Sequence, residues 1–283
     1  MFVIVDDHQF DALGAADHPD VKTPVLDALA ERGVRFSQAT NMGSLMPAIC
    51  SPARACQLTG LHPFRANTDP RPGGGNLDFV TIPGELPTVP ELFGQAGYET
   101  FCTGKWHNDP ATLLRSFDRA DSIFVSGMCP HEAVPLIDRA GLERGEVPQV
   151  GKGFSTEIFC DVMVDFLSTR DEAKPFFAWL ALTSPHDPRT PPPEFRDWYD
   201  PAQLTLPTAF RPEPSFDNGE LAVRDEKLLS KPLTEDAMRA DLANYYGMIS
   251  HHDHHLGRVF SELRALGQED NTIVVYIGDH GLA

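Results

Sequence analysis

PFFAWLALT, residues 175–183, is an almost uninterrupted run of apolar residues that is long enough for one β-strand. A strand without a polar face must be covered on both sides, which is typical of a parallel sheet packed between helices. Three further strands are predicted along the chain, at MFVIV (1–5), YETFCTG (98–104) and TIVVYIGD (272–279).

Helical patterns stand between these predicted strands. A helix is expected at TPVLDALAERG (23–33), with Thr23 as its N-cap and Gly33 as its end. Other helices are expected at residues 51–60, within 88–98, at 155–172 and at 234–267. Strands alternating with helices predict an α/β fold with a mostly parallel sheet between two helical layers.

The composition limits the possible partners. The chain has 283 residues, of which 41% are hydrophobic, and 23 Lys and Arg against 41 Asp and Glu give a formal charge of -18. Such a charge disfavours a nucleic-acid surface. No apolar run approaches the ~20 residues of a membrane span, and no signal peptide is recognisable. We expect a periplasmic or secreted protein or a cytoplasmic one, and the five irregularly spaced cysteines predict no disulfide framework.

Both ends of the chain coincide with predicted strands. Residue 1 already opens the strand MFVIV, and the chain stops shortly after TIVVYI, at Ala283. Domains seldom begin and end inside their own sheet. We therefore expect this sequence to be a piece of a longer protein.

Charged residues and histidines follow each predicted strand. The residues concerned are Asp6 and Asp7, Lys105 and His107, His186, and Asp279 and His280. Because parallel strands end at one edge of a sheet, where ligands bind, these groups are expected to meet. Asp6, Asp7 and Asp279 would offer a hard cation oxygen ligands, with His280 as a fourth. The remaining three would face the cation as charge and proton carriers, although an isolated aspartate after a strand is commonly a cap or turn residue.

The stretch ICSPARACQLTG (49–60) places a thiol at the start of a predicted helix. Ser51 is expected to cap this helix and Gly60 to end it. Cys50 would then lie just before a helix N-terminus, with the positive charge of Arg54 one turn inside. This setting predicts a reactive thiol and an anion-binding site. The alternative is a buried cysteine with a structural role only.

Together, these motifs resemble the N-terminal catalytic part of a type I sulfatase, within the alkaline phosphatase superfamily. The shared residues occur in the family's order: Asp6-Asp7, the C-x-P-x-R signature Cys50-Ser51-Pro52-Ala53-Arg54 with Thr59-Gly60, Gly104-Lys105-Trp106-His107, Pro185-His186 and Gly278-Asp279-His280-Gly281. The resemblance implies an alkaline-phosphatase-like fold and the hydrolysis of a sulfate ester. It also implies that residues 1–283 form one catalytic α/β domain that is incomplete at its C-terminus.

The resemblance also implies a modification and a metal. A formylglycine-generating enzyme would oxidise Cys50 to formylglycine, whose hydrated aldehyde supplies the nucleophile. The implied cation is calcium, with manganese or magnesium as alternatives. The metal ligands would be Asp6, Asp7, residue 50, Asp279 and His280.

The resemblance gives the remaining residues separate roles. Arg54 would brace the hydroxyl of residue 50, and Lys105 would neutralise the sulfate as its S–O bond breaks. His186 would protonate the leaving alcohol. His107 would take the proton from the second hydroxyl of residue 50. The substrate would be a sulfated small molecule or saccharide, selected by the loops 62–80, 126–150 and 188–232; the oligomeric state stays open.

Two departures from the family keep alternatives open. The chain ends at Ala283, before the further lysine and the small C-terminal subdomain that the family carries. His280 stands where many sulfatases have asparagine. A phosphodiester or phosphonate monoester hydrolase of the same superfamily is therefore one alternative, and a non-catalytic metal-binding fragment is another.

A histidine-rich segment, HHDHH (251–255), lies inside the last predicted helix. His251 and His255 share one helix face at i, i+4, which is compatible with zinc binding. Since the segment lies far from every predicted strand end, a solvated helix face is the favoured interpretation, with Asp253 in a local hydrogen bond.

Overall fold

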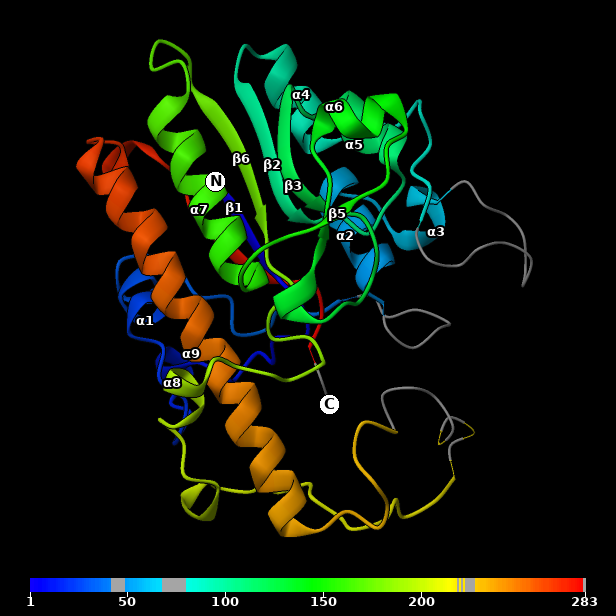
Figure 1. Cartoon of the computed structure of the whole chain (residues 1–283), viewed down its shortest axis with the longest axis vertical. Coiled ribbons are helices and arrows are strands. Elements are labelled where there is room, and N and C mark those ends of the chain that lie inside the picture. The colour runs from blue at the N-terminus through cyan, green and yellow to red at the C-terminus, as the bar shows by residue number, and fades with distance from the viewer. Residues whose placement is uncertain (42–48, 68–79, 218, 220, 222–226, 282–283) are drawn as a thin grey trace.

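The computed structural model describes residues 1–41, 49–67, 80–217, 219, 221 and 227–281 (Figure 1). Its strands are β1 (Phe2–Val5), β2 (Glu99–Lys105), β3 (Arg119–Phe124), β4 (Pro135–Leu136), β5 (Gln149–Val150), β6 (Phe176–Ala181) and β7 (Val275–Gly278). Its helices are α1 (Pro24–Glu31), α2 (Cys50–Thr59), α3 (Pro63–Ala66), α4 (Val89–Gln95), α5 (Pro110–Ser116), α6 (Arg139–Arg144), α7 (Ser155–Thr169), α8 (Pro193–Arg196) and α9 (Glu235–Ala265).

Within the described residues, the main sheet has five strands in the order β3-β2-β6-β1-β7. Every neighbouring pair is parallel. The apolar run at 175–183 supplies β6, the central strand, which explains why it has no polar face. The prediction of a parallel sheet between helices is confirmed.

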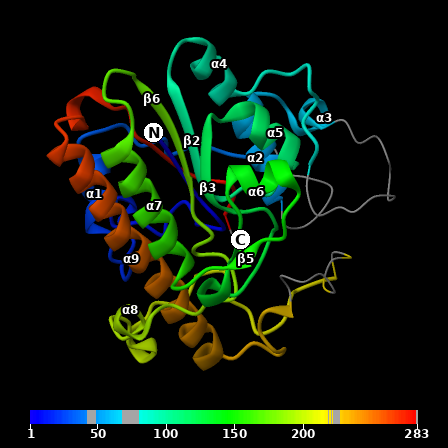
Figure 2. The same ribbon diagram turned by 45° about the horizontal axis from the view of Figure 1, so that its top comes forward.

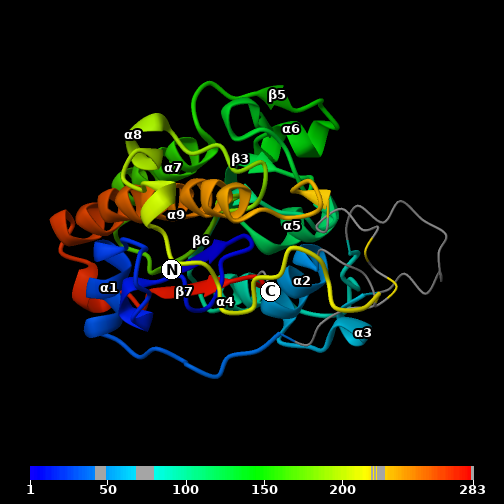
Figure 3. The ribbon, with the colours of Figure 1, turned by 90° about the horizontal axis from the view of Figure 1, so that it is seen from below.

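Side chains of the central strands alternate between two hydrophobic cores. Val3 and Val5 of β1 point into the core beneath α7 and α9, whereas Ile4 between them points into the core beneath α2, α4 and α5. Leu180 and Trp179 of β6 divide in the same way. Figures 2 and 3 show the two helical layers on opposite faces of the sheet. The period-2 geometry of a strand thus builds both layers from single apolar runs.

Strand β3 was not predicted from the sequence. It lies at the edge of the sheet and pairs only with β2 among the described strands of that sheet. Its residues Arg119 and Asp121 are exposed, so the strand lacks the apolar run that marks its buried neighbours. An edge strand needs only one partner and tolerates such residues.

The N-terminus of α1 is capped by a distant residue. Thr23 was expected as its cap, but its side chain makes no capping bond. Instead, the buried carboxylate of Asp253, on α9, accepts hydrogen bonds from the backbone N–H groups of Val25 (3.1 Å) and Leu26 (2.8 Å). Asp253 thereby satisfies two N–H groups that the helix itself leaves free.

The HHDHH segment is not a solvated helix face, so that interpretation was wrong. His251, His252 and Asp253 are almost fully buried. Helix α9 contacts α7, α8 and α1 from several sides, so that little of its middle reaches solvent (Figure 1). The error arose because the sequence does not reveal how many elements surround a helix.

The sequence also predicts surface loops at 69–75, 185–193 and 207–214. Residues 207–214 contain no regular element, while in the stretch 185–193 Pro185 and His186 are buried and Pro193 begins α8. Residues 69–75 lie outside the described residues. No helix in the described part of the chain has the length and apolar character needed to cross a lipid bilayer.

Gly104 allows β2 and β6 to approach each other at the end of the sheet where the polar residues gather. Its φ is +98°, and a Cβ placed there would lie 1.9 Å from the carbonyl oxygen of Ala181. That contact is with backbone, so only separation of the strands could relieve it.

We expect Gly104→Ala to lower the free energy of unfolding by at least about 3 kcal/mol, or to prevent folding, because it adds this clash to the cost of a positive φ. Gly97→Ala is the matched control, since Gly97 has φ +87° and nothing within 4 Å of the added Cβ. It should cost only about 1–2 kcal/mol. Urea unfolding measures the free energy of unfolding of both variants. Equal losses would show that the close approach of β2 and β6 at Gly104 is unimportant for stability.

Candidate active site

The carboxyl ends of the main strands bring together residues from both ends of the chain. Asp6 and Asp7 follow β1, Lys105 ends β2, and Asp279 and His280 follow β7. The strands β1 and β7 are neighbours in the sheet, and β2 is separated from β1 only by β6. The structure therefore brings these polar groups together at one edge of the sheet, as predicted.

Four of the expected metal ligands form one compact group. Single ligand atoms of Asp6, Asp7, Cys50 and His280 all lie within 4.8 Å of one another. The Sγ atom of Cys50 lies 3.0 Å from Nε2 of His280, which in turn lies 3.3 Å from Oδ1 of Asp7. Residue 50 thus belongs to the same group as the carboxylates, as the resemblance implied.

Asp279 lies beside this group but is held differently. Its Oδ2 accepts a hydrogen bond from Nε of Arg54 (3.1 Å), and a second guanidinium nitrogen lies 3.0 Å away. Its Oδ1 accepts from the backbone N–H of His280 (2.9 Å). As the structure stands, Asp279 forms a buried ion pair with Arg54 and is not part of the compact ligand group.

Lys105 pairs with Asp6 in the interior. Its Nζ forms an ion pair with Oδ2 of Asp6, and both side chains are almost completely buried. The guanidinium of Arg54 donates to the carbonyl oxygen of Lys105 (2.7 Å), which links the two cations.

These neighbours shift the carboxylate pKa values in opposite directions. Burial raises the pKa of Asp6, but the opposing charges of Lys105, His186 and Arg54 bring it well below its ordinary value. Burial, followed by repulsion from Asp6, raises the pKa of Asp7 well above its ordinary value. The same two causes raise the pKa of Asp279 to about 6.

The group fits a divalent cation. Asp6 keeps one buried oxygen, Oδ1, without a hydrogen bond to any described residue. Among the described residues, the three carboxylates form buried ion pairs with two permanent cations, Arg54 and Lys105, while burial lowers the pKa of the third basic neighbour, His186. The group therefore has an excess of negative charge. An additional positive charge would offset the repulsion from Asp6 that adds to burial in raising the pKa of Asp7. Carboxylate oxygens are ligands that hard cations prefer.

Cys50 is the first residue of α2, whereas the sequence predicted that it would lie just before the helix. Helix α2 begins at Cys50, and Ser51 does not cap it; the Ser51 hydroxyl accepts from the backbone N–H of Val80 (2.6 Å). The prediction that Gly60 ends the helix is confirmed by its left-handed conformation, with φ +68°.

The expectation of a reactive thiolate at Cys50 was wrong. Burial, followed by the negative charge of Asp6, raises the pKa of the Cys50 thiol far above its ordinary value. The helix N-terminus and Arg54 do not offset these carboxylates, because Arg54 is already paired with Asp279. An unmodified Cys50 is therefore a protonated thiol here.

His186 reaches the edge of the group from the segment after β6. Its Nδ1–H donates to the carbonyl oxygen of Asp187 (2.7 Å), and its Nε2 faces Oδ2 of Asp7 at 3.8 Å. Burial lowers the pKa of His186 despite the nearby Asp6. Because Nδ1 is engaged with a carbonyl, Nε2 is the nitrogen that can exchange a proton with a ligand.

His107 follows β2 and has a left-handed backbone, with φ 51°. A Cβ at Gly127 would lie 2.8 Å from its imidazole ring, so Gly127 leaves room for the ring. His107 is not in the compact ligand group.

Two further residues support the site: Tyr245, which sequence reasoning missed, and His131, which lies in the loop 126–150 that was expected to select the substrate. Tyr245, on α9, donates its hydroxyl proton to the carbonyl oxygen of Asp7 (2.7 Å) and accepts from the backbone N–H of Gln9 (2.8 Å). His131 donates from Nε2 to the carbonyl oxygen of His186 (3.0 Å). Both act through backbone atoms, which leave no pattern in a sequence.

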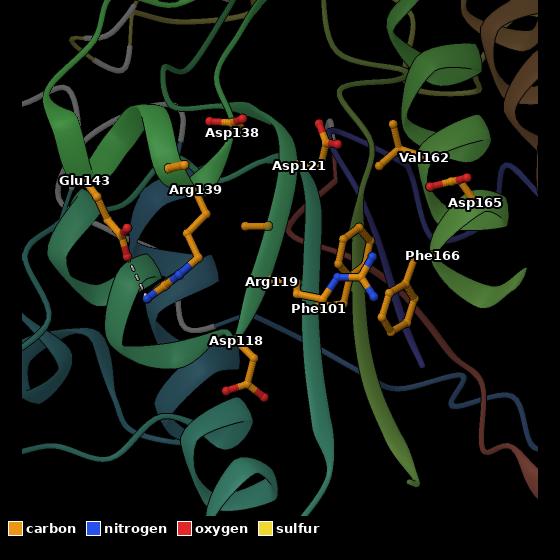
Figure 4. Close-up of a pocket in the computed structure, with 12 residues that line it drawn as sticks. Phe101, Asp118, Arg119, Asp121, Asp138, Arg139, Glu143, Val162, Asp165 and Phe166 are labelled. Atoms are coloured by element: carbon orange, nitrogen blue, oxygen red, sulfur yellow. Dashed lines mark ion pairs between the residues drawn. The ribbon is translucent and has the colours of Figure 1, made fainter. Parts of the chain in front are cut away.

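A cavity of about 280 Å³ lies elsewhere, between β3, α6 and α7. Figure 4 shows Arg119 and Arg139 lining it, with Arg139 paired to Glu143 at 3.0 Å. None of the strand-end residues described above lines this cavity. It is therefore separate from the candidate active site.

The comparison with protein families agrees with the motifs and the geometry. The family model described as Sulfatase matches residues 1–283, and the chain belongs to that family. The ulvan-active sulfatase of Formosa agariphila is 30% identical, over 99% of this chain and 50% of the relative. The chain therefore spans half the length of that curated relative.

Solved structures confirm the alkaline-phosphatase-like fold. A protein solved with its substrate D-glucosamine-2-N,6-O-disulfate has a TM-score of 0.72 and 22% identity, over 99% of this chain and 65% of the other. The phosphonate monoester hydrolase of Agrobacterium radiobacter has a TM-score of 0.69 and 20% identity, over 99% and 62%. At these identities, the two structures establish the fold alone.

The buried pair between Arg54 and Asp279 yields a stability prediction. Arg54→Met should lower the free energy of unfolding by about 3–5 kcal/mol, because it leaves a buried carboxylate without its partner. Arg196→Met is the control: Arg196 pairs with Asp197 at 3.0 Å on the surface, where removal should cost about 0–1 kcal/mol. Thermal unfolding at one fixed calcium concentration measures both. If Arg54→Met and Arg196→Met had similar melting temperatures, the ion pair between Arg54 and Asp279 would not be important for stability.

Proposed function

We propose that the full-length protein is a sulfuric ester hydrolase that cleaves a sulfate monoester of a saccharide. The nucleophile is formylglycine made from Cys50 by a formylglycine-generating enzyme, and a divalent cation, calcium by resemblance, is bound at the strand ends.

The observation that carries this proposal is the position of Cys50. Its Sγ lies 3.0 Å from His280 and within 4.8 Å of ligand atoms of Asp6 and Asp7, in a group with excess negative charge. A residue in this position would lie next to a cation held by these carboxylates, and it lies close to the buried side chains of Arg54 and Lys105. A structural cysteine has no need of such neighbours.

The cation and formylglycine would supply distinct chemistry. When bound, the cation polarises the sulfate oxygens and stabilises negative charge. Formylglycine supplies a hydroxyl nucleophile in place of the protonated thiol. Asp6, Asp7 and His280 would hold the cation together with Asp279, whose Oδ1 lies 3.9 Å from Nε2 of His280.

The charged side chains then divide the remaining work. Arg54 orients Asp279 and steadies residue 50, which lies one helical turn before it on α2. Lys105 neutralises charge on the sulfate as the S–O bond breaks. In its imidazolium form, His186 would protonate the leaving alcohol from Nε2. His107 would accept the proton of the second hydroxyl of residue 50, so that the aldehyde C=O forms again as the C–O bond to sulfate breaks.

A sulfated saccharide is the substrate class that the relatives support. One relative is described as ulvan-active, and one solved structure of the same fold contains a disulfated glucosamine. The phosphonate monoester hydrolase of the same fold supports a second candidate, in which the ester is a phosphonate. Turnover of an aryl sulfate and an aryl phosphonate by the same preparation separates the two, because the proposed function requires the sulfate to be the better substrate.

The first functional prediction concerns residue 50. Full-length protein produced with an active formylglycine-generating enzyme should carry formylglycine at residue 50, seen by mass spectrometry as loss of sulfur and gain of oxygen. Cys50→Ala should abolish sulfatase turnover. Cys56→Ala, in the same helix and half-buried, is the matched control and should retain it. An unmodified Cys50 in a fully active enzyme would rule out the proposed nucleophile.

The second functional prediction concerns His186. His186→Ala should slow cleavage of alkyl sulfates by ~10²–10⁴, since an alkoxide leaves poorly without a proton. Nitrophenyl sulfate should be affected much less, because nitrophenolate needs no protonation. The measurement is kcat/KM across a series of leaving groups, with the exposed His254→Ala on α9 as the control. An equal defect for every leaving group would assign His186 to sulfate binding.

A further inference from the structure

A second group of potential metal ligands lies between two helices. It consists of Glu157 in the first turn of α7 and of His251 and His255, one turn apart on α9. One ligand atom from each residue lies within 4.8 Å of the other two. The two helices lie side by side on one face of the sheet (Figure 1).

His251 is buried without hydrogen bonds. Its exposed fraction is 0%, and neither ring nitrogen bonds to any residue that the structure describes. A buried polar group left in this state typically costs about 1–3 kcal/mol and calls for an explanation. The surroundings are aromatic: the rings of Phe154 and Phe195 lie 4.7 and 4.9 Å away, centroid to centroid.

The spacing to Glu157 is that of two ligands on one ion. Nε2 of His251 lies 3.4 Å from Oε1 of Glu157, yet no hydrogen bond forms between them. Two ligands at about 2.0–2.1 Å from a tetrahedral zinc ion are separated by about 3.4 Å. The Glu157 side chain is 40% exposed, so the group is open to entry from solvent.

We propose that Glu157, His251 and His255 bind a divalent cation of the zinc class and thereby join α7 to α9. Two imidazoles and one carboxylate suit zinc, cobalt or nickel and not calcium, which prefers oxygen ligands. This chemistry differs from that of the carboxylate-rich group at the strand ends. The site goes beyond the proposed sulfatase activity and does not depend on it.

Arg258 is a built-in competitor for His255. Its guanidinium donates to Nδ1 of His255 (3.1 Å) and also pairs with Asp161 (2.5 Å). If the metal takes Nδ1, the lone pair that accepts this bond is used. If the metal takes Nε2, Nδ1 must carry the ring proton and cannot accept. In either case Arg258 has to release His255, and its guanidinium can remain paired with Asp161.

Cobalt and zinc test the proposal in the intact chain with excess calcium, which occupies oxygen-rich sites. Wild type should bind one equivalent of Co²⁺ with the visible absorption of four-coordinate nitrogen and oxygen ligation, and Zn²⁺ should displace it. His255→Asn and Glu157→Gln should each weaken binding by at least about tenfold, as expected when a metal site loses a contact. Cys50→Ala should change nothing, because residue 50 belongs to the other group.

Two further variants make the result decisive. His254→Asn alters the exposed histidine between the proposed ligands and should leave binding unchanged. Arg258→Met should tighten binding, an effect that misfolding cannot mimic. The proposal is overturned if Co²⁺ does not bind, if binding survives both ligand substitutions, if His254→Asn weakens binding as much as His255→Asn, or if Arg258→Met fails to tighten it.

Discussion

The structure depends on balancing buried charge at the carboxyl edge of the sheet. Asp6, Asp7 and Asp279 are all almost completely buried, and an isolated carboxylate in such a place would be strongly unfavourable. Arg54 and Lys105, equally buried, compensate for two of the three charges. The uncompensated charge favours a divalent cation, so the arrangement that stabilises the fold also defines where chemistry can occur.

This balance also fixes the elements around the site. Arg54 reaches from α2 to Asp279 after β7 and to the carbonyl oxygen of Lys105 at the end of β2, so one side chain ties a helix to two strands. Helix α9 supports the same edge from the opposite layer, through the bond from Tyr245 to the carbonyl oxygen of Asp7. Both helical layers therefore contribute to the position of the strand ends.

Much of the architecture could be predicted from local patterns. Apolar strands buried on both faces, such as β6, and long helices such as α7 are recognisable because burial dictates their composition. Strand β3 escaped prediction because it lies at an edge and carries the exposed Arg119 and Asp121. The cap of α1 could not be predicted because Asp253 is distant in the sequence. It lies 228 residues from Val25 and 227 from Leu26, whose N–H groups it binds.

For the candidate site, the sequence by itself determined which residue types follow each strand and, through the parallel sheet, that they share one edge. It also carried the C-x-P-x-R signature that places the chain among the sulfatases. Only the tertiary structure decided the pairings: Arg54 binds Asp279, the pKa of the Cys50 thiol is raised and not lowered, and His251 is buried beside Glu157. The physical reason is that burial and pairing depend on every element that surrounds a side chain, and these elements come from distant parts of the chain.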